Sequence, residues 1–221
     1  MTSLPDATVE RLKVHEIFYS LQGESRSVGW PTVFIRLTGC PLRCQYCDTE
    51  YAFTGGEWMS LDEIIAVVNQ YRTRHVTVTG GEPLAQKACL LLLSLLADKD
   101  LRVSLETSGA LDVSAVDPRV VKVLDIKTPG SGEAARNLWS NLDHLSPRDQ
   151  IKFVICNHDD YDWCKQIIAE HALLSRCEVL FSPSHNELPA KDLAEWILAD
   201  QLPVRFQTQL HKQLWGDLPG H

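Results

Sequence analysis

The sequence predicts an α/β fold, a partial and distorted (β/α) barrel of about six βα units. Two observations predict it. Apolar runs of strand length alternate with helical patterns from about residue 33 to the end of the chain. The chain has 221 residues, whereas a complete eightfold barrel needs about 250. A flat doubly wound sheet remains an alternative. No linker or break in composition divides residues 1–221, so we expect a single domain.

The expected strands are short apolar runs, most of them followed by polar or turn residues. The first is Thr32–Leu37, and a cysteine-containing loop follows it directly. The others are His75–Thr79, Arg102–Glu106, Val121–Ile126, Ile151–Ile155, Glu178–Phe181 and Val204–Gln207.

Four helices are expected between these strands. Ser60 and Glu63 form a capping box at the start of the first helix. Its apolar face consists of Leu61, Ile64, Ile65, Val68 and Tyr71. Lys87–Ala97 is apolar nearly all round, so we expect it to be buried. The remaining two are Asp159–His171 and Pro189–Leu198, the second with proline in its first turn.

Composition limits the class of function. The chain has 29 acidic and 21 basic residues, with a formal net charge of −8. A dedicated nucleic-acid-binding protein needs a basic face, so we expect no direct nucleic acid binding. A small anionic substrate held by one or two placed cations is compatible with this balance.

Three features indicate a cytoplasmic protein with no membrane partner. Met1–Asp6 lacks the basic and apolar segments of a signal peptide. The longest apolar stretch, Ala88–Ala97, is too short to cross a bilayer. The seven cysteines are odd in number and mostly scattered, unlike a secreted disulfide framework.

Three cysteines, Cys40, Cys44 and Cys47, lie within eight residues. A structural zinc site normally has four protein ligands, whereas an iron–sulfur cubane held at three corners leaves one iron open. The spacing therefore favours an open cluster. Zinc with a distant fourth ligand and chance clustering remain alternatives. The other cysteines lie in apolar or helical segments, where a structural role is expected: Cys89, Cys156, Cys164 and Cys177.

Several polar motifs follow predicted strands. Gly80–Pro83, Glu106–Gly109 and Asp125–Lys127 each come directly after or at the end of a strand, as the cysteine loop does. Because the carboxyl ends of parallel strands meet at one edge, these motifs are expected to share one site.

Two of these motifs together resemble the radical S-adenosylmethionine superfamily: the Cys-x3-Cys-x-aromatic-Cys loop and Gly80-Gly81-Glu82-Pro83. The resemblance implies a 4Fe–4S cluster ligated by Cys40, Cys44 and Cys47. It also implies that S-adenosylmethionine binds the open iron and yields a radical that abstracts hydrogen.

A narrower resemblance is to the 7-carboxy-7-deazaguanine synthase family. The matching segments are Leu21–Glu24, Arg36, Cys47–Thr49, Glu106–Gly109, Asp125–Pro129 and Gln209–Lys212. It implies a lyase that converts 6-carboxy-5,6,7,8-tetrahydropterin to 7-carboxy-7-deazaguanine and ammonia, in the synthesis of queuosine or related nucleosides. Mg²⁺, a homodimer and an external one-electron reductant such as flavodoxin or ferredoxin are implied as well.

The resemblance also implies cofactor-binding residues. Tyr46 would lie against the adenine, unless it is a core aromatic residue, and Gly81 would approach the methionine amino group. Glu106 would contact cofactor or substrate, with a capping or salt-bridge role as the alternative. The family often has Ser-Pro-Lys where this chain has Asp125-Ile126-Lys127. The complete implied set is Tyr46, Gly80, Gly81, Glu82, Glu106, Lys127 and Ser182.

The implied substrate-binding residues surround the same loop. Arg36 is a cation within an apolar strand, and it would pair with the substrate carboxylate unless it forms an internal salt bridge. Thr49 would ligate Mg²⁺, and His211 would lie near the substrate unless it is structural. The complete implied substrate set is Leu21, Gln22, Gly23, Arg36, Thr79 and His211.

Two rival functions remain at this stage. A glycyl-radical-enzyme activase shares the cysteine spacing, but it does not account for Leu21–Gly23 or Arg36. A zinc-stabilised or electron-transfer protein is the rival outside the enzymes. In some family members the terminal carboxylate reaches the site. Here Gln213–His221 continues past that point, so this contact is not expected.

Overall fold

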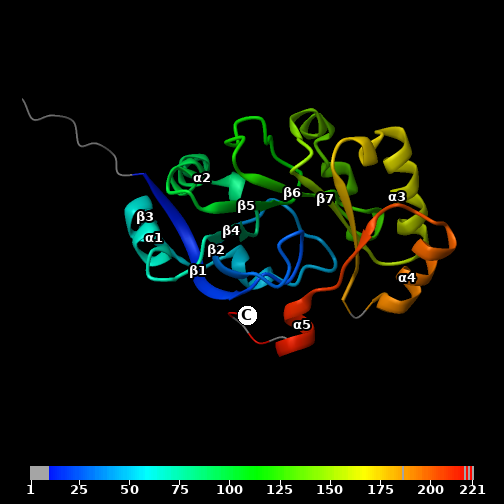
Figure 1. The fold of residues 1–221 in the computed structure, drawn as a ribbon, viewed down its shortest axis with the longest axis horizontal. Coiled ribbons are helices and arrows are strands. Elements are labelled where there is room, and N and C mark those ends of the chain that lie inside the picture. The colour runs from blue at the N-terminus through cyan, green and yellow to red at the C-terminus, as the bar shows by residue number, and fades with distance from the viewer. Residues whose placement is uncertain (1–9, 186, 217, 219, 221) are drawn as a thin grey trace, which may run out of the picture.

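A nine-stranded sheet, in the order β3-β1-β2-β4-β5-β6-β7-β8-β9, runs through the part of the chain that the structure describes (Figure 1). The computed structural model describes residues 10–185, 187–216, 218 and 220. Met1–Asp6, for which no targeting signal was expected, lies outside them. β1 pairs antiparallel with β2 and β3, and the neighbours from β2 to β9 pair in parallel.

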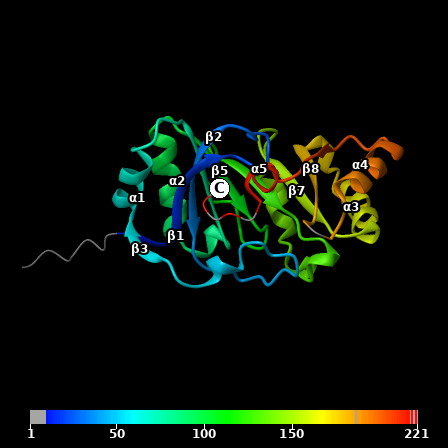
Figure 2. The same ribbon diagram turned by 90° about the horizontal axis from the view of Figure 1, so that it is seen from below.

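The strands are β1 (Arg11–Leu21), β2 (Pro31–Leu37), β3 (Glu57–Ser60), β4 (His75–Gly80), β5 (Arg102–Thr107), β6 (Val121–Asp125), β7 (Gln150–Ile155), β8 (Glu178–Pro183) and β9 (Arg205–Phe206). The α-helices are α1 (Leu61–Val68), α2 (Ala88–Asp98), α3 (His158–Glu170), α4 (Ala190–Ala199) and α5 (Leu210–Trp215). α1 and α2 lie toward one end of the sheet, α3 and α4 toward the other, and α5 near the middle (Figures 1 and 2).

All seven predicted strands are present, within a residue or two at their ends. β1 and β3 were not predicted. β3 has only four residues, and β1 is partly exposed with an irregular register between Val14 and Glu16. Neither is a buried apolar run, which was the signal used for the other strands.

The four predicted helices are also present, and α5, with six residues, was missed. Ser60 forms the predicted capping box with Glu63. The expectation of full burial for the second helix was wrong. Cys89, Leu92, Leu93 and Leu96 are buried, but Leu91 is 46% exposed. A helix that covers one side of a sheet keeps its outer stripe in solvent even where that stripe is apolar.

The βα alternation is incomplete in the described residues. No α-helix connects β5 to β6, and only short 3₁₀ segments lie between β6 and β7. The sheet does not close, since β3 and β9 form its two edges. These features confirm the prediction of a partial, distorted barrel.

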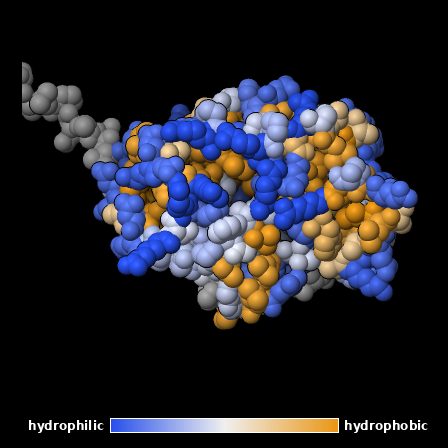
Figure 3. Space-filling model, viewed as in Figure 1, coloured by the Kyte–Doolittle hydropathy of each residue, from blue (hydrophilic) through white to orange (hydrophobic). Residues whose placement is uncertain are grey.

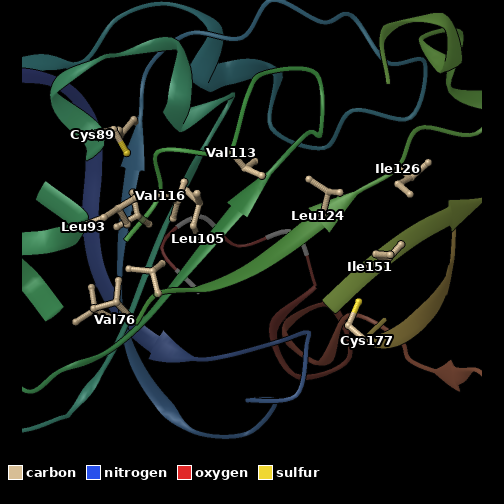
Figure 4. Packing of buried hydrophobic residues seen from close by; sticks show 14 of the residues in the cluster. Val76, Cys89, Leu93, Leu105, Val113, Val116, Leu124, Ile126, Ile151 and Cys177 are labelled. Carbon is tan, nitrogen blue, oxygen red and sulfur yellow. The ribbon is translucent and has the colours of Figure 1, made fainter. Parts of the chain in front are cut away.

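The core lies between the sheet and its helices. It includes Cys89, Cys164 and Cys177, three of the cysteines that were expected to be structural. Figure 4 shows Cys89 and Leu93 of α2 among buried side chains of the neighbouring strands.

Within the described residues, none of the helices has both the length and the apolar character that a bilayer span requires. The face seen in Figure 3 mixes hydrophilic and hydrophobic residues, and no single apolar surface dominates it.

Candidate active site

A cavity of about 230 Å³ lies at the carboxyl ends of the parallel strands. It brings together every residue that was predicted to bind metal, cofactor or substrate, except Glu82. The predicted residues that line it are Leu21, Gln22, Gly23, Arg36, Cys40, Cys44, Tyr46, Cys47, Thr49, Thr79, Gly80, Gly81, Glu106, Lys127, Ser182 and His211.

The three loop cysteines are free thiols. Burial raises the pKa of the Cys44 thiol to about 11, so in the absence of a metal this thiol is protonated. Among the described residues, no three His, Cys, Asp or Glu side chains are grouped so that they could hold one metal ion. A zinc site needs its ligands on one ion, whereas a cubane distributes its thiolates over its irons.

The Gly80–Pro83 motif packs directly against the start of the cysteine loop. The backbone N–H of Glu82 donates to the Gly39 carbonyl at 2.8 Å. A Cβ added at Gly81 would collide with the Gly39 carbonyl and lie 2.7 Å from the Cβ of Cys40. Gly80 has a φ of +148°, a conformation that side chains disfavour. Both glycines are needed for this close approach.

The Glu82 side chain does not line the cavity and forms hydrogen bonds inside the protein instead. Its carboxylate accepts hydrogen bonds from the backbone of Leu84 and Ser108 at 2.9 and 2.7 Å, and from the hydroxyls of Thr107 and Ser108. The residue is fully buried. Its side chain ties the glycine motif to the end of β5, and its predicted cofactor contact stays a prediction.

Tyr46 and Lys127 lie together at the end of β6. The Lys127 Nζ is 5.8 Å from the centre of the Tyr46 ring and 3.1 Å from Asp125 Oδ2. Burial opposes the charge of Lys127, but the attraction of the Asp125 carboxylate and of Cys44 together outweighs burial and raises the pKa of Lys127. The cation therefore stays charged at neutral pH.

The predicted substrate segment is held from within the protein. The Gln22 amide nitrogen donates to Thr77 Oγ1 at 3.1 Å and to Glu106 Oε1 at 3.3 Å. Its amide oxygen accepts from the backbone of Glu24. Thr79 Oγ1 donates to the other Glu106 oxygen at 3.2 Å. Since the Gln22 amide is engaged in this way, the segment offers a ligand mainly its backbone.

Arg36 forms the internal salt bridge that was the alternative for this residue. Its Nε lies 2.7 Å from Glu16 Oε1, which also accepts from the Tyr51 hydroxyl. The guanidinium lies over the rings of Phe18 and Tyr51. In the described part of the chain its two terminal nitrogens donate to no other group. These nitrogens can therefore donate hydrogen bonds to a carboxylate of a bound ligand.

Thr49 and His211 both line the cavity, close to the hydrogen bonds that Gln209 makes. The Thr49 hydroxyl donates to Asp48 Oδ1 at 2.7 Å. Gln209 donates to Asp48 Oδ2 and to Glu24 Oε1, at 3.0 and 2.8 Å. Burial lowers the pKa of His211, against the opposing charges of Glu24 and Asp48. His211 is therefore neutral at neutral pH.

Several polar residues at the cavity were not predicted, among them Glu24, Lys152 and Gln209. Lys152 sits in β7 and binds Glu24 through Nζ at 2.7 Å. Lys152 is a cation inside the apolar run Ile151–Ile155, which is the pattern that identified Arg36. The sequence could therefore have predicted Lys152 as well. Nothing in the sequence pattern indicates its partner.

The residues present fit the cofactors that the sequence motifs imply. Two buried polar atoms that belong to cavity-lining residues, Tyr46 Oη and Asp125 Oδ1, have no hydrogen-bond partner in the described residues. Such atoms are rare in folded proteins unless a ligand or water satisfies them. Together with three free thiols and the space kept by Gly81, they point to a site completed by bound groups.

Comparison with known proteins agrees with this geometry. Residues 34–125 match the model of the radical SAM superfamily. The chain is 46% identical to a 7-carboxy-7-deazaguanine synthase from Chlorobaculum tepidum, over 95% of this chain and 97% of that protein. It is 42% identical to one from Koribacter versatilis, over 92% and 97%. The chain belongs to the 7-carboxy-7-deazaguanine synthase family.

Solved structures share the fold of this 7-carboxy-7-deazaguanine synthase family member. QueE from Escherichia coli superposes with a TM-score of 0.75 at 24% identity, covering 94% of this chain and 99% of that one. Streptococcus suis SuiB bound to S-adenosylmethionine gives 0.55 at 12% identity, covering 80% and 48%. Membership of the superfamily implies a 4Fe–4S cluster and S-adenosylmethionine as cofactors. The individual site residues and Mg²⁺ stay predictions.

Proposed function

We propose that the protein is a radical S-adenosylmethionine lyase that converts 6-carboxy-5,6,7,8-tetrahydropterin to 7-carboxy-7-deazaguanine with loss of ammonia. The observation that carries the proposal is one cavity, lined both by the cysteine loop and by Leu21–Gly23 with Arg36. Identity of 46% to a synthase of this name over nearly the whole chain supports it.

In this proposal Cys40, Cys44 and Cys47 hold the cluster, and Gly81 leaves room for the cofactor beside them. When bound, the cluster and S-adenosylmethionine supply the one-electron chemistry that starts hydrogen abstraction. Tyr46 and Lys127 form one wall of the cofactor side. The backbone at Gly80 and the buried Ser182 complete that side.

On the substrate side, the chain binds and orients the pterin. The terminal nitrogens of Arg36 pair with its carboxylate as a bidentate fork. Glu106, held by Gln22 and Thr79, accepts hydrogen bonds from ring N–H groups. The stacked rings of Phe18 and Phe34, with centres 4.9 Å apart, help to exclude water from the reacting atoms.

A magnesium ion would bind at Thr49 in this proposal. Magnesium prefers oxygen ligands and keeps several waters. The Thr49 hydroxyl and the Asp48 carboxylate are hydrogen-bonded neighbours that line the cavity and offer such oxygens. The ion would also bind the substrate carboxylate and orient it.

The same proposal covers the partners and setting of the enzyme. We infer an external one-electron reductant such as flavodoxin or ferredoxin, a homodimer, a cytoplasmic location and a product used for queuosine or another deazapurine. Residues 1–221 would form one domain, since a single sheet extends from β3 to β9. The net charge of −8 supports the absence of direct nucleic acid binding.

An anaerobic turnover assay tests the proposal. Reconstituted protein is incubated with 6-carboxytetrahydropterin, S-adenosylmethionine, Mg²⁺ and a chemical reductant. We expect a deazaguanine product with its ultraviolet absorption, and none from Cys44→Ala. Cys177→Ala, which changes a cysteine of the core, is the matched control and should keep activity. Absence of product from the cluster-loaded wild type would disprove the substrate assignment.

A further inference from the structure

Lys152 is a largely buried cation on β7 that the proposed function does not yet use. Its side chain is 14% exposed. The Nζ lies 2.7 Å from Glu24 Oε2 and 3.6 Å from Asp125 Oδ2. Glu24 directly follows the proposed substrate segment Leu21–Gly23, and Asp125 pairs with Lys127 on the cofactor side. Lys152 therefore lies between the proposed substrate side and the proposed cofactor side of the cavity.

The segment that carries Glu24 is anchored to distant parts of the chain as well as by local hydrogen bonds. The backbone of Ser25 donates to the Gln207 side chain at 2.9 Å, and that of Arg26 to Gln150 at 2.7 Å. Gln209 donates to Glu24. These partners are 124 to 185 positions away in the sequence. Two ion pairs also hold this segment. The pair between Glu24 and Lys152 is largely shielded from solvent, whereas the pair between Arg26 and Glu178 is more exposed.

Lys152 offsets part of the negative charge of the carboxylates that line the cavity. Four carboxylates and three lysine or arginine cations are among the described lining residues. They are Glu24, Asp48, Glu106 and Asp125, and Arg36, Lys127 and Lys152. Without Lys152, two cations would face four carboxylates. A substrate that itself carries a carboxylate would then meet a repulsive cavity.

We propose that Lys152 is a positioning residue for the anionic pterin substrate: it fixes Glu24 against β7 and offsets the carboxylates that would repel that substrate. This inference rests on the proposed function and adds a residue to it. Lys152 acts through Glu24 and the charge of the cavity, and Arg36 keeps the direct contact with the substrate carboxylate.

The neighbouring titratable groups give the proposal a distinctive pH signature. Burial and the charge of Glu24 raise the pKa of Glu106, and the charges of Lys152 and Arg36 oppose that rise. Loss of Lys152 therefore raises the pKa of Glu106 further. As the pH is lowered, Glu106 then takes up its proton at a higher pH in the variant than in the wild type, which removes part of the repulsion. Lys127, whose pKa is raised, keeps its charge throughout this range, and another titratable group at the cavity is His211, whose pKa burial lowers.

The test measures binding of pterin-6-carboxylate, a redox-stable and fluorescent analogue, to cluster-loaded protein under anaerobic conditions. S-adenosylmethionine is present and no reductant is added. Lys152→Met removes the charge, and Lys152→Arg keeps it. Lys122→Met is the matched control, because Lys122 is a buried lysine on β6 that pairs with Asp149 at 3.2 Å outside the cavity.

We expect Lys152→Met to weaken binding about tenfold or more near pH 8, and the loss to shrink as the pH is lowered. Lys152→Arg and Lys122→Met should stay within about threefold of the wild type. Binding by Lys152→Met that matches the wild type, or a loss that is the same at every pH, would overturn the proposal. If Lys152→Met does not fold, the test uses Lys152→Arg alone. Binding of the analogue about tenfold weaker in Lys152→Arg would then contradict the proposal.

Failure of this inference differs from failure of the proposed function. Analogue binding needs no turnover. A wild type that binds the analogue through Lys152 but forms no deazaguanine would refute only the reaction. A wild type that forms the product while Lys152→Met binds normally would refute only the role of Lys152.

Discussion

Arg36 and Lys152 are two cations inside strands that are largely apolar, and both line the same cavity. A buried charge is costly unless it is paired. Each is paired by a carboxylate from a part of the chain next to the site, Glu16 and Glu24. The protein thus fixes its cations before any ligand arrives, which lowers the cost of organising the site on binding.

Arg36→Ala is expected to weaken substrate binding about tenfold or more, because it removes the fork proposed for the substrate carboxylate. The variant also leaves Glu16 without its cation, which adds to the repulsion. The KM for the pterin in anaerobic turnover measures the effect, and the visible spectrum of the cluster should not change. Arg102→Ala, at an exposed position on β5, is the control. Loss of the cluster in Arg36→Ala would instead show a structural role.

His211 predicts a pH dependence of stability. Burial lowers its pKa in the folded protein below the unfolded value of about 6.5. The unfolded chain then binds the proton more tightly, so this contribution to stability is present above about pH 6.5 and lost as the pH falls. Denaturant unfolding of the wild type and His211→Asn near pH 7.5 and 5.5 measures it. The variant should lose less stability on acidification, and equal losses would contradict the assignment.

At the scale of elements, the cysteine loop and the end of β4 are packed as one unit through Gly39, Cys40 and Gly81. Gln45 of the loop also donates its backbone N–H to Ser131 at 3.0 Å, beyond the end of β6. The loop is therefore fixed by two other strand ends. A preformed loop binds a cluster with less loss of chain entropy.

Gly81→Ala should reduce cluster loading, because its Cβ would collide with the Gly39 carbonyl and displace Cys40. Iron content after anaerobic reconstitution, with circular dichroism as a check on folding, measures the effect. We expect several-fold less iron than in the wild type. Gly29→Ala is the control for backbone strain alone, since Gly29 has a φ of +85° but an added Cβ there meets nothing within 4 Å. Full loading of a folded Gly81→Ala protein would refute the packing argument.

The docking of α5 depends on Gly23. Leu210 donates its backbone N–H to the Gly23 carbonyl at 2.9 Å, and a Cβ at Gly23 would overlap the His211 ring. Gly23→Ala should therefore displace α5 and speed hydrogen exchange at residues 210–215, while exchange in the buried strand β5 stays slow. Unchanged protection of α5 in this variant would contradict the contact.

At the scale of the whole molecule, the open sheet is bridged by the β1–β2 loop. Residues Glu24–Arg26 in that loop bind partners on β7 and beyond β9, on the far side of the site. An open sheet leaves its strand ends accessible, and this loop closes part of that opening. The fold gains a defined cavity without the full set of βα units.

The sequence predicted the parallel strands because they are continuous buried apolar runs such as Thr32–Leu37. It did not reveal β1, whose residues are only partly buried and pair antiparallel at one side of the sheet. Nor did it reveal α5, because a six-residue helix has too little periodicity to detect.

Within the site, local motifs were predictable and distant contacts were not. The cysteine loop and Gly80–Gly81 carry their spacing in the sequence. The pair between Lys152 and Glu24 joins residues 128 positions apart, so only the fold shows it. The full engagement of the Glu82 carboxylate likewise depends on how β4 meets β5.

The most direct test of the central claim is electron paramagnetic resonance of the anaerobically reconstituted and reduced protein, before and after S-adenosylmethionine is added. A cluster held by Cys40, Cys44 and Cys47 leaves one iron open. We therefore predict about four iron atoms per chain and a spectrum that changes when the cofactor binds. A protein that carries one zinc and no iron would contradict the account. So would a cluster whose spectrum stays unchanged when S-adenosylmethionine is added.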